Sequence, residues 1–319
     1  MVLWRKMCSM PITHHLTFMH RLSHIFSNRM SSVMAGALCL ILAELCFAFV
    51  GALVKALSDD MTHSQLVFFR NASALVILLP ILLKNGPQSG WQLVKTEKLG
   101  LHVFRAMCGM IAMYGFFYTL ATLTLAQAMM ALLLAPFIVP IIARIWLKER
   151  IDIKTIAAIL IGFCGVAFIL LNKPEQQQPL NWLSISVAIG CACLVATTKC
   201  TIRKLTDTEP SIRIVLYFTG IATFVSSLPM LVLWQPFLLA VIPWLLLMGI
   251  LAAVGQLLMT KAFALTSPVK IGLLSYTSII FAAIIGAIGW QEPITTSLIG
   301  GSVLIIWAAN VTIRQRWLW

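Results

Sequence analysis

Long apolar stretches alternate with short polar connectors along almost the whole chain. Each stretch holds roughly 20 residues, the length that a helix needs to cross the hydrocarbon core of a bilayer. A transmembrane β-strand would instead show about ten residues of alternating polarity. The pattern predicts an all-α, polytopic membrane protein with ten transmembrane helices, at residues 34–57, 65–83, 101–121, 127–146, 153–171, 181–202, 213–233, 241–264, 268–289 and 296–313.

The order of the helices in the first half of the chain returns in the second half. In both halves, a long helix, a tight turn and a second long helix lead to a short acidic connector and a helix rich in small residues. A shift of about 143 residues places Glu149 on Glu292 and Ala121 on Ala264, and such internal repeats mark structural units. We predict a basic cytoplasmic tail over 1–32, a five-helix repeat over 33–171, a linker over 172–180, a second five-helix repeat over 181–313 and a cytoplasmic tail over 314–319.

Lysine and arginine gather on every second connector, which is typical of the cytoplasmic side of a membrane protein. The N-terminal tail and the connectors after the second, fourth, sixth and eighth helices are basic, and we assign Lys199, Arg203 and Lys204 to the cluster after the sixth helix. This alternation places both termini in the cytoplasm. Because each half has an odd number of helices, the second repeat begins on the opposite side, so the two repeats are inverted, as in many secondary transporters.

The composition agrees with a membrane protein and argues against other classes. Of the 319 residues, 60% are hydrophobic and 10% are charged, whereas about a quarter of a soluble domain is charged. The net charge of +13 lies between the apolar stretches rather than along one stripe, so we do not expect nucleic acid as a partner. The eight cysteines lie mostly within apolar stretches, which favours buried thiols over disulfides or a metal site.

Glu44 lies near the centre of the first predicted helix, where an acid costs roughly 3 kcal/mol and therefore suggests a function. It is a candidate for coupling transport to protons or cations, or for binding a substrate amine. The alternative is a buried acid that is protonated or paired with a basic residue. Lys55 follows about three helical turns later on nearly the same face, and it is either part of the site or a side chain that reaches the interface.

Two arginines lie about one turn inside predicted helices. Arg70 is near the outer end of the second helix, and Arg105 is near the cytoplasmic end of the third. A guanidinium fork at either position can bind the carboxylate or phosphate of a substrate. The alternative is that both side chains reach the lipid headgroups.

Aromatic and amide side chains on the core helices are further candidates for the substrate site. Tyr114 and Tyr118 are four residues apart and share one helix face, and Gln256 and Tyr276 lie on the helices of the second half. Together they would suit an aromatic or adenine-bearing metabolite. An interfacial aromatic belt is the alternative, and it is the preferred interpretation for Trp146 and Trp290.

The fourth predicted helix contains Pro136 and Pro140. A proline inside a helix removes a backbone hydrogen bond and bends the helix, so this pair is a candidate hinge for a gate, or else only shapes the bundle. We interpret Glu149 and Glu292 as structural acids at helix starts. The glycines within the spans are expected to allow close helix packing.

These features resemble the drug/metabolite transporter superfamily in its EamA-type, ten-helix form. The resemblance covers Val33–Ile313 and rests on the five-plus-five plan, on Leu147-Lys148-Glu149-Arg150 and Gln291-Glu292, and on Ala121 and Ala264 at the end of the third helix of each half. A narrower resemblance, to the S-adenosylmethionine uptake carriers of intracellular bacteria, rests on Val67-Phe68-Phe69-Arg70 ending at Pro80 and on His102-Val103-Phe104-Arg105 leading to Tyr118.

The resemblance implies an inner-membrane carrier that works by alternating access and has no ATP site. No G-x-x-x-x-G-K-[ST] motif is present in the sequence. S-adenosylmethionine uptake is the narrower expectation, and export of amino acids or related metabolites is the alternative. The expected partners are a small-molecule substrate and the lipid bilayer, and a homodimer is left open.

A membrane enzyme and a channel are the competing classes. The sequence offers no Ser/His/Asp set, no acid pair with catalytic spacing and no cluster of metal ligands, so we expect no catalytic residue, cofactor or metal. It also has no ring of charges or repeated filter sequence that would indicate a channel. A transporter is therefore the predicted class.

Overall fold

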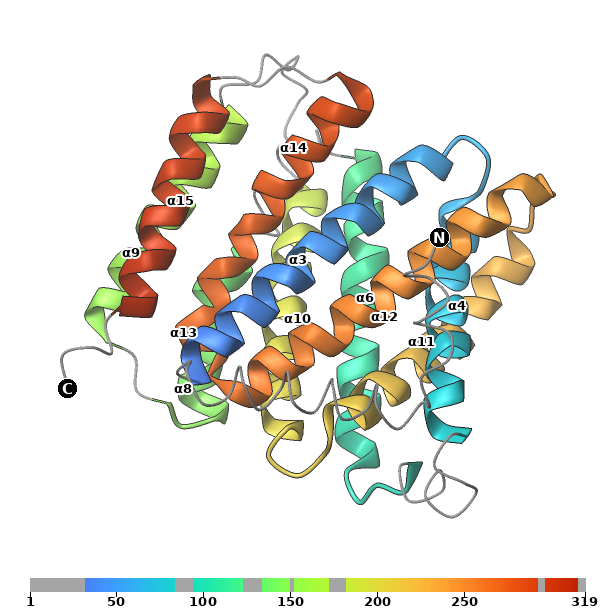
Figure 1. The fold of residues 1–319 in the computed structure, drawn as a ribbon, viewed down its shortest axis with the longest axis horizontal. Coiled ribbons are helices and arrows are strands. Elements are labelled where there is room, and N and C mark those ends of the chain that lie inside the picture. The colour runs from blue at the N-terminus through green and yellow to red at the C-terminus, as the bar shows by residue number, and fades with distance from the viewer. Residues whose placement is uncertain are drawn as a thin grey trace, which may run out of the picture.

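Helices fill the computed structural model of the chain, which describes residues 32–83, 94–122, 134–149, 152–171, 182–291 and 296–314 (Figure 1). The first half contains α3 (Ser32–Leu57), α4 (His63–Leu83), α6 (Leu99–Thr122), α8 (Ala135–Trp146) and α9 (Ile153–Leu171). The second half contains α10 (Trp182–Leu205), α11 (Ser211–Val232), η1 (Leu239–Val241), α12 (Ile242–Leu265), α13 (Pro268–Ile271), η2 (Gly272–Tyr276), α14 (Thr277–Trp290) and α15 (Thr296–Arg314).

The helices have the length and polarity of membrane spans. Within the described ranges, six helical stretches are long and apolar enough to cross a bilayer: Ser32–Leu57, Leu99–Phe116, Trp182–Leu205, Ser211–Val232, Leu239–Leu265 and Pro268–Trp290. Large apolar side chains face outward, and Val232 is 83% exposed, as expected where the solvent is lipid rather than water. The prediction of an all-α, polytopic membrane protein is therefore confirmed.

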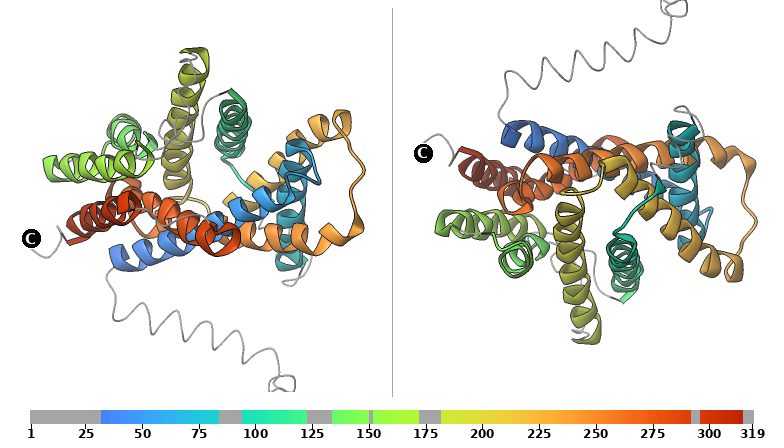
Figure 2. Two further views of the ribbon diagram at one scale, coloured as in Figure 1. Left: turned by 90° about the horizontal axis from the view of Figure 1, so that it is seen from above. Right: turned by 90° about the horizontal axis from the view of Figure 1, so that it is seen from below.

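Helix packing has an approximate twofold symmetry. The first, second, third, fourth and fifth helices of one half correspond in order to those of the other half, and the main packing pairs remain the same when the two halves are exchanged. α3 packs along α12 as α10 packs along α6, and α3 meets α14 as α10 meets α8. α4 pairs with its own counterpart α11, and α9 pairs with α15; Figures 1 and 2 show these two pairs at opposite ends of the molecule. The halves therefore build their core mainly against each other.

The predicted offset of 143 residues holds at the backbone. Lys148 and Gln291 are 143 residues apart, both have φ of 54°, and they are the only non-glycine residues with positive φ in the described ranges. Each follows the end of a helix, α8 or α14. The N–H of Glu149 donates to the Ala143 carbonyl at 3.2 Å, which is the hydrogen bond that closes a helix C-terminus after a left-handed residue. Both connectors therefore leave their helix with the same left-handed step.

The ninth span differs from the prediction of one continuous helix over 268–289. It consists of α13, the 3-10 segment η2 and α14. Gly272 follows α13 directly and has low helix propensity. The hydroxyls of Thr277 and Ser278 donate to the carbonyls of Leu274 and Ser275 at 2.6 and 2.7 Å, so side chains bind carbonyls at the break, as a membrane interior requires.

The two prolines of the predicted hinge do not both lie inside a helix. Pro136 lies in the first turn of α8, where a missing N–H costs nothing because it has no helical acceptor. Only Pro140 lies in the helix interior. The prediction that both prolines bend one helix is thus wrong for Pro136, and residues 127–133 of that predicted span fall outside the described ranges.

Glycine permits the close contact between α12 and α4. A Cβ atom on Gly249 would lie 2.3 Å from Ser73 Cβ and 2.9 Å from the backbone N of Ala74. These distances are below van der Waals contact, and one of the atoms is backbone, so the two helices would have to separate.

We expect Gly249→Ala to lower the thermal unfolding temperature of the protein in detergent, because a methyl group at this position forces α4 away from α12. Gly51→Ala is the matched control, since a Cβ there meets nothing within 4 Å and alanine favours a helix by about 1 kcal/mol over glycine. Equal unfolding temperatures for the two variants would contradict the close contact.

Glu209, in the turn between α10 and α11, connects two segments. Its carboxylate accepts a hydrogen bond from Thr96 Oγ1 at 2.6 Å, before the start of α6, and another from Arg213 in α11. Burial raises the pKa of the Glu209 carboxyl, but the hydrogen bonds from Thr96 and Arg213 and the charge of Arg213 together lower it below its usual value of 4.5. The ionised form of Glu209 therefore stabilises the fold.

Because the pKa of Glu209 is lower in the folded protein than in the unfolded chain, its contribution to stability is present above pH 4.5 and is lost as the pH falls through the folded pKa. We expect Glu209→Gln to cost about 1 kcal/mol at pH 7, with a difference from wild type that disappears in acid. Thermal unfolding at a series of pH values measures this. Asp207→Asn, which changes an exposed acid 3.8 Å from Arg203, should leave the pH dependence of thermal unfolding as in wild type. A Glu209→Gln variant that also unfolds like wild type at every pH would refute the role of Glu209.

Candidate functional site

Four helices at the interface between the halves each contribute at least one buried charged or amide side chain. Glu44 of α3, Arg105 of α6, Lys199 of α10 and Gln256 of α12 are 8%, 1%, 9% and 8% exposed. These helices form the two equivalent pairs α3–α12 and α6–α10. A polar group in each of four central helices is costly in a membrane, so the group is the strongest candidate for the site.

Glu44 and Gln256 lie at one level of the α3–α12 pair. A Cβ on Gly255 would lie 2.8 Å from Phe47 Cε1, so Gln256 is next to the point where α12 meets Phe47. Glu44 precedes Phe47 by three residues, or about 4.5 Å of helix rise. At the other end of α3, Gly36 faces Thr266 and Ala262, which shows that the two helices are antiparallel.

Arg105 provides donors for an anion. Its Nη2 donates to Gln256 Oε1 at 2.8 Å, and its Cζ lies 3.6 Å from the centroid of the Phe218 ring, a cation–π contact. Its Nε and Nη1 have no acceptor among the described residues. Buried donors of this kind are normally satisfied, so the geometry suits a carboxylate or phosphate that is not part of the described chain.

The charge of Arg70 acts on Arg105, and Tyr114 packs against the apolar cluster that contains Phe218. Arg70 Nη1 lies 3.4 Å from Asn71 Oδ1 and 3.8 Å from Met113 Sδ. The Tyr114 hydroxyl is buried and has no partner in the described ranges. The described residues place no carboxylate within 4 Å of Arg70 or Arg105, so the positive charge remains for a ligand.

A second polar contact joins Lys199 and Ser275. Lys199 Nζ donates to Ser275 Oγ at 2.7 Å. Ser275 belongs to η2, the break in the ninth span, and η2 packs against α3, the helix of Glu44. No ion pair within 4 Å joins Glu44 to a basic side chain among the described residues, so a basic partner for Glu44 stays a prediction.

The structure does not bring all the predicted residues to this site. Lys55 is exposed, with Nζ 4.6 Å from the centroid of the Trp290 ring, so it does not share a site with Glu44. Tyr118 is 42% exposed, and Tyr276 is fully buried in a core with α9 and α15. The predicted aromatic lining therefore reduces to Tyr114 near the arginines. Tyr118 faces outward from α6. Tyr276 lies at the end of η2 and packs against Gly162 of α9.

Sequence reasoning missed Lys199, Ser275 and Phe218. Lys199 was assigned to a cytoplasmic cluster, but it lies within α10 and is buried. Its position inside an apolar span of 24 residues was the available signal, since a cation there has the same cost as Glu44. Nothing in the local sequence distinguishes Ser275 and Phe218 from other polar or aromatic residues in the spans.

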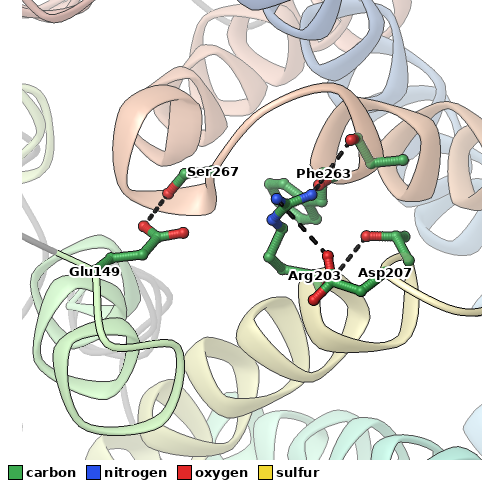
Figure 3. Close-up of polar contacts among 7 residues, drawn as sticks. Glu149, Arg203, Asp207, Phe263 and Ser267 are labelled. Carbon is green, nitrogen blue, oxygen red and sulfur yellow. Dashed lines mark hydrogen bonds and ion pairs between the residues drawn. The ribbon is translucent and has the colours of Figure 1, made fainter.

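Contacts at one end of the bundle hold the turn between α12 and α13 (Figure 3). The Ser267 hydroxyl, which caps α13 by accepting from the Val269 N–H at 3.1 Å, donates to the Glu149 carboxylate. Arg203 Nη1 donates to the carbonyls of Phe263 and Ala264 at the end of α12. Glu149 therefore links the first half to the second, while the predicted counterpart Glu292 lies outside the described residues. In the ranges that the structure covers, no three His, Cys, Asp or Glu side chains form a metal-binding group.

Known proteins share both the sequence pattern and the fold. The sequence matches the EamA-like transporter family over residues 34–171 and again over 182–314. The pseudopaline exporter of Pseudomonas aeruginosa is 29% identical over 88% of this chain and 97% of that protein. The S-adenosylmethionine uptake transporter of Rickettsia bellii is 24% identical over 79% and 84%, and the riboflavin transporter of Vibrio cholerae is 25% identical over 87% and 92%. A crystal structure with 16% identity has a TM-score of 0.73 over 88% of this chain and 95% of that chain, which shows the shared fold.

The alternative in which Lys199 neutralises Glu44 predicts that Lys199→Met destabilises the protein by on the order of 3 kcal/mol, because the carboxylate is then left buried without a cation. The double variant Glu44→Gln/Lys199→Met should recover much of this loss, since no buried charge remains. Thermal unfolding of both single variants and of the double variant in detergent measures the coupling. Additive losses would show that the two residues do not form a pair.

Proposed function

Because this chain belongs to the EamA-like transporter family, we propose that it carries a small zwitterionic metabolite across the inner membrane by alternating access. It is a membrane transporter of small metabolites. We place both termini in the cytoplasm, on the basis of the basic connectors.

The observation that carries the proposal is the unsatisfied guanidinium of Arg105. A side chain with two buried donor nitrogens that find no acceptor in the described part of the chain is unfavourable unless an anion binds to it for part of the cycle. Arg70 and Tyr114 add donors nearby, and Gln256 fixes the orientation of Arg105. Together they suit a carboxylate, which a guanidinium binds with paired hydrogen bonds.

The opposite charge of the zwitterion is assigned to Glu44, which lies at the same level of the bundle as Gln256. Arg105 and Glu44 both belong to the first half, whereas Gln256, which binds Arg105, belongs to the second. S-adenosylmethionine carries a carboxylate and cationic groups, and uptake of this compound is the first candidate, supported by the similarity to the Rickettsia uptake transporter. The second candidate is export of an amino acid or related metabolite, supported by the similarity to the Pseudomonas exporter.

Alternating access requires an element that has two arrangements. We assign this role to the broken ninth span, where η2 separates α13 from α14, with Pro140 of α8 as a second bend. Discontinuous helices near a central site are a recurring feature of secondary transporters.

We expect purified protein in proteoliposomes to take up labelled S-adenosylmethionine or labelled phenylalanine in a saturable manner. Arg105→Gln should weaken the apparent affinity by roughly 10- to 100-fold, since charge-assisted hydrogen bonds contribute about 1.5–3 kcal/mol. Arg105→Lys should recover part of the loss, because it retains the charge but not the fork. Vesicles of opposite orientation distinguish import from export.

Arg144→Gln is the matched control, because Arg144 is an exposed arginine in the last turn of α8. It should transport like wild type. Wild-type transport that is indifferent to Arg105→Gln, in protein that remains folded, would refute the anion site.

A further inference from the structure

We propose that the central site takes a substrate with two acidic groups, and that Arg70 binds the second of them. The inference rests on the proposed function, which assigns one carboxylate of the substrate to Arg105 and its cationic group to Glu44. A carboxylate or a phosphate on the side chain of an amino-acid-like metabolite supplies the second acidic group. Such a substrate carries a net negative charge, whereas a simple zwitterion is neutral.

The guanidinium of Arg70 has only weak partners in the described part of the chain. Its Nη1 lies 3.4 Å from the Asn71 amide oxygen and 3.8 Å from the Met113 sulfur, and both are neutral acceptors at long distance. No ion pair within 4 Å involves Arg70 in the ranges that the structure covers. A guanidinium has five N–H donors, and Arg70 is half-buried about two turns into α4. It therefore has donors left for an acid that the ligand supplies.

Arg70 and Arg105 border one apolar cluster. Its buried members are Val67, Ala106, Met110, Phe218 and Ala222. Arg70 contacts Met113, which packs against this cluster, and the guanidinium carbon of Arg105 lies 3.6 Å from the centroid of the Phe218 ring. The cluster joins α4, α6 and α11, so it packs together the helices that carry the two arginines.

Tyr114 adds an uncharged donor on the same cluster. It follows Met113 in α6 and packs against the cluster, and its hydroxyl is buried without a partner among the described residues. Buried donors normally have acceptors. The paired donors of Arg105 can engage both oxygens of one carboxylate, so the Tyr114 hydroxyl and the Arg70 guanidinium remain as donors for a second acidic group.

The charges on the core helices also favour an acidic substrate. The cations Arg70, Arg105 and Lys199 lie within α4, α6 and α10, and the acid Glu44 lies within α3. No ion pair within 4 Å neutralises any of the four within the described ranges. A neutral zwitterion brings one charge of each sign and leaves this excess of positive charge unchanged. A second acidic group reduces the excess, and unpaired charge inside a membrane protein is costly.

The two candidate substrates of the proposed function differ on this point. S-adenosylmethionine has one carboxylate, so it leaves Arg70 without an anion. An amino acid with an acidic side chain offers its amine to Glu44, its α-carboxylate to Arg105 and its second acid to Arg70. The inference therefore favours the second candidate, an amino acid or related metabolite, and restricts it to acidic ones.

The test compares ligands that differ in one acidic group. Aspartate, glutamate and phosphoserine are paired with asparagine, glutamine and serine, and their binding to the purified protein in detergent is measured by isothermal titration calorimetry. We expect wild type to bind the acidic member at least about tenfold more tightly in at least one pair, because only that member forms charge-assisted hydrogen bonds with Arg70. The pair with the largest preference distinguishes a carboxylate from a phosphate. Equal affinities within all three pairs would overturn the proposal.

Variants assign the preference to Arg70. Arg70→Gln should weaken the acidic ligand to the affinity of its neutral partner and leave the neutral partner unchanged, while Arg70→Lys should keep part of the preference because it keeps the charge. Arg105→Gln should weaken both members of a pair by a similar factor, since both have the α-carboxylate. Arg144→Gln, which changes an exposed arginine of α8, is the matched control and should bind like wild type. A preference for the acid that persists in Arg70→Gln refutes the role of Arg70.

The outcomes separate the inference from the proposed function. Neutral amino acids that bind as tightly as their acidic partners, and that enter proteoliposomes equally well, refute the second acid site and leave the zwitterion carrier intact. If no member of any pair binds, the inference is refuted, and uptake of labelled phenylalanine or S-adenosylmethionine decides the proposed function by itself. Binding of an acidic ligand that Arg70→Gln weakens selectively supports both.

Discussion

The cost of holding charge away from water determines the arrangement of the centre of this protein. A membrane helix that carries a buried Glu, Lys or Arg is stable only if another helix supplies a partner. Here Arg105 on α6 binds Gln256 on α12, and Lys199 on α10 binds Ser275 in η2. The first of these contacts joins helices that hold equivalent places in the two halves, so it also ties the halves together.

The framework is symmetric, but its chemistry is not. α3 and α10 occupy equivalent places and pack on equivalent partners, yet one carries an acid and the other a base. α6 and α12 are likewise equivalent, and they carry a cation and an amide. Repetition thus supplies a scaffold in which two halves can move against one another, and substitution at a few central positions supplies polarity with a direction. A zwitterion fits such a site in one orientation, whereas a symmetric site would not distinguish its two ends.

The sequence predicted those features that depend on long patterns. The apolar spans, the offset of 143 residues and the exceptional position of Glu44 all follow from hydrophobicity and from the cost of charge in a membrane. It did not predict that Lys199 is buried, because Lys199 lies close enough to Arg203 and Lys204 in the chain to be taken for part of a cytoplasmic cluster. It also did not reveal the break at η2, since 268–289 is uniformly apolar and the carbonyls there bind side-chain hydroxyls of Thr277 and Ser278. The different surroundings of Tyr114, Tyr118 and Tyr276 depend on helix rotation and on this break, which periodicity does not define.

The break at η2 lies next to a buried polar contact. Ser275 lies within it and accepts a hydrogen bond from Lys199 of α10, while the turn between α12 and α13 is held by Ser267 against Glu149 of the other half. A rearrangement of α13 and η2 that opens one side of the bundle must therefore move the Ser275 hydroxyl relative to Lys199. Loss of that hydrogen bond would leave a buried ammonium without its acceptor, and reforming it would favour the closed arrangement. A single serine in a 3-10 turn can in this way stabilise one arrangement of the bundle over the other.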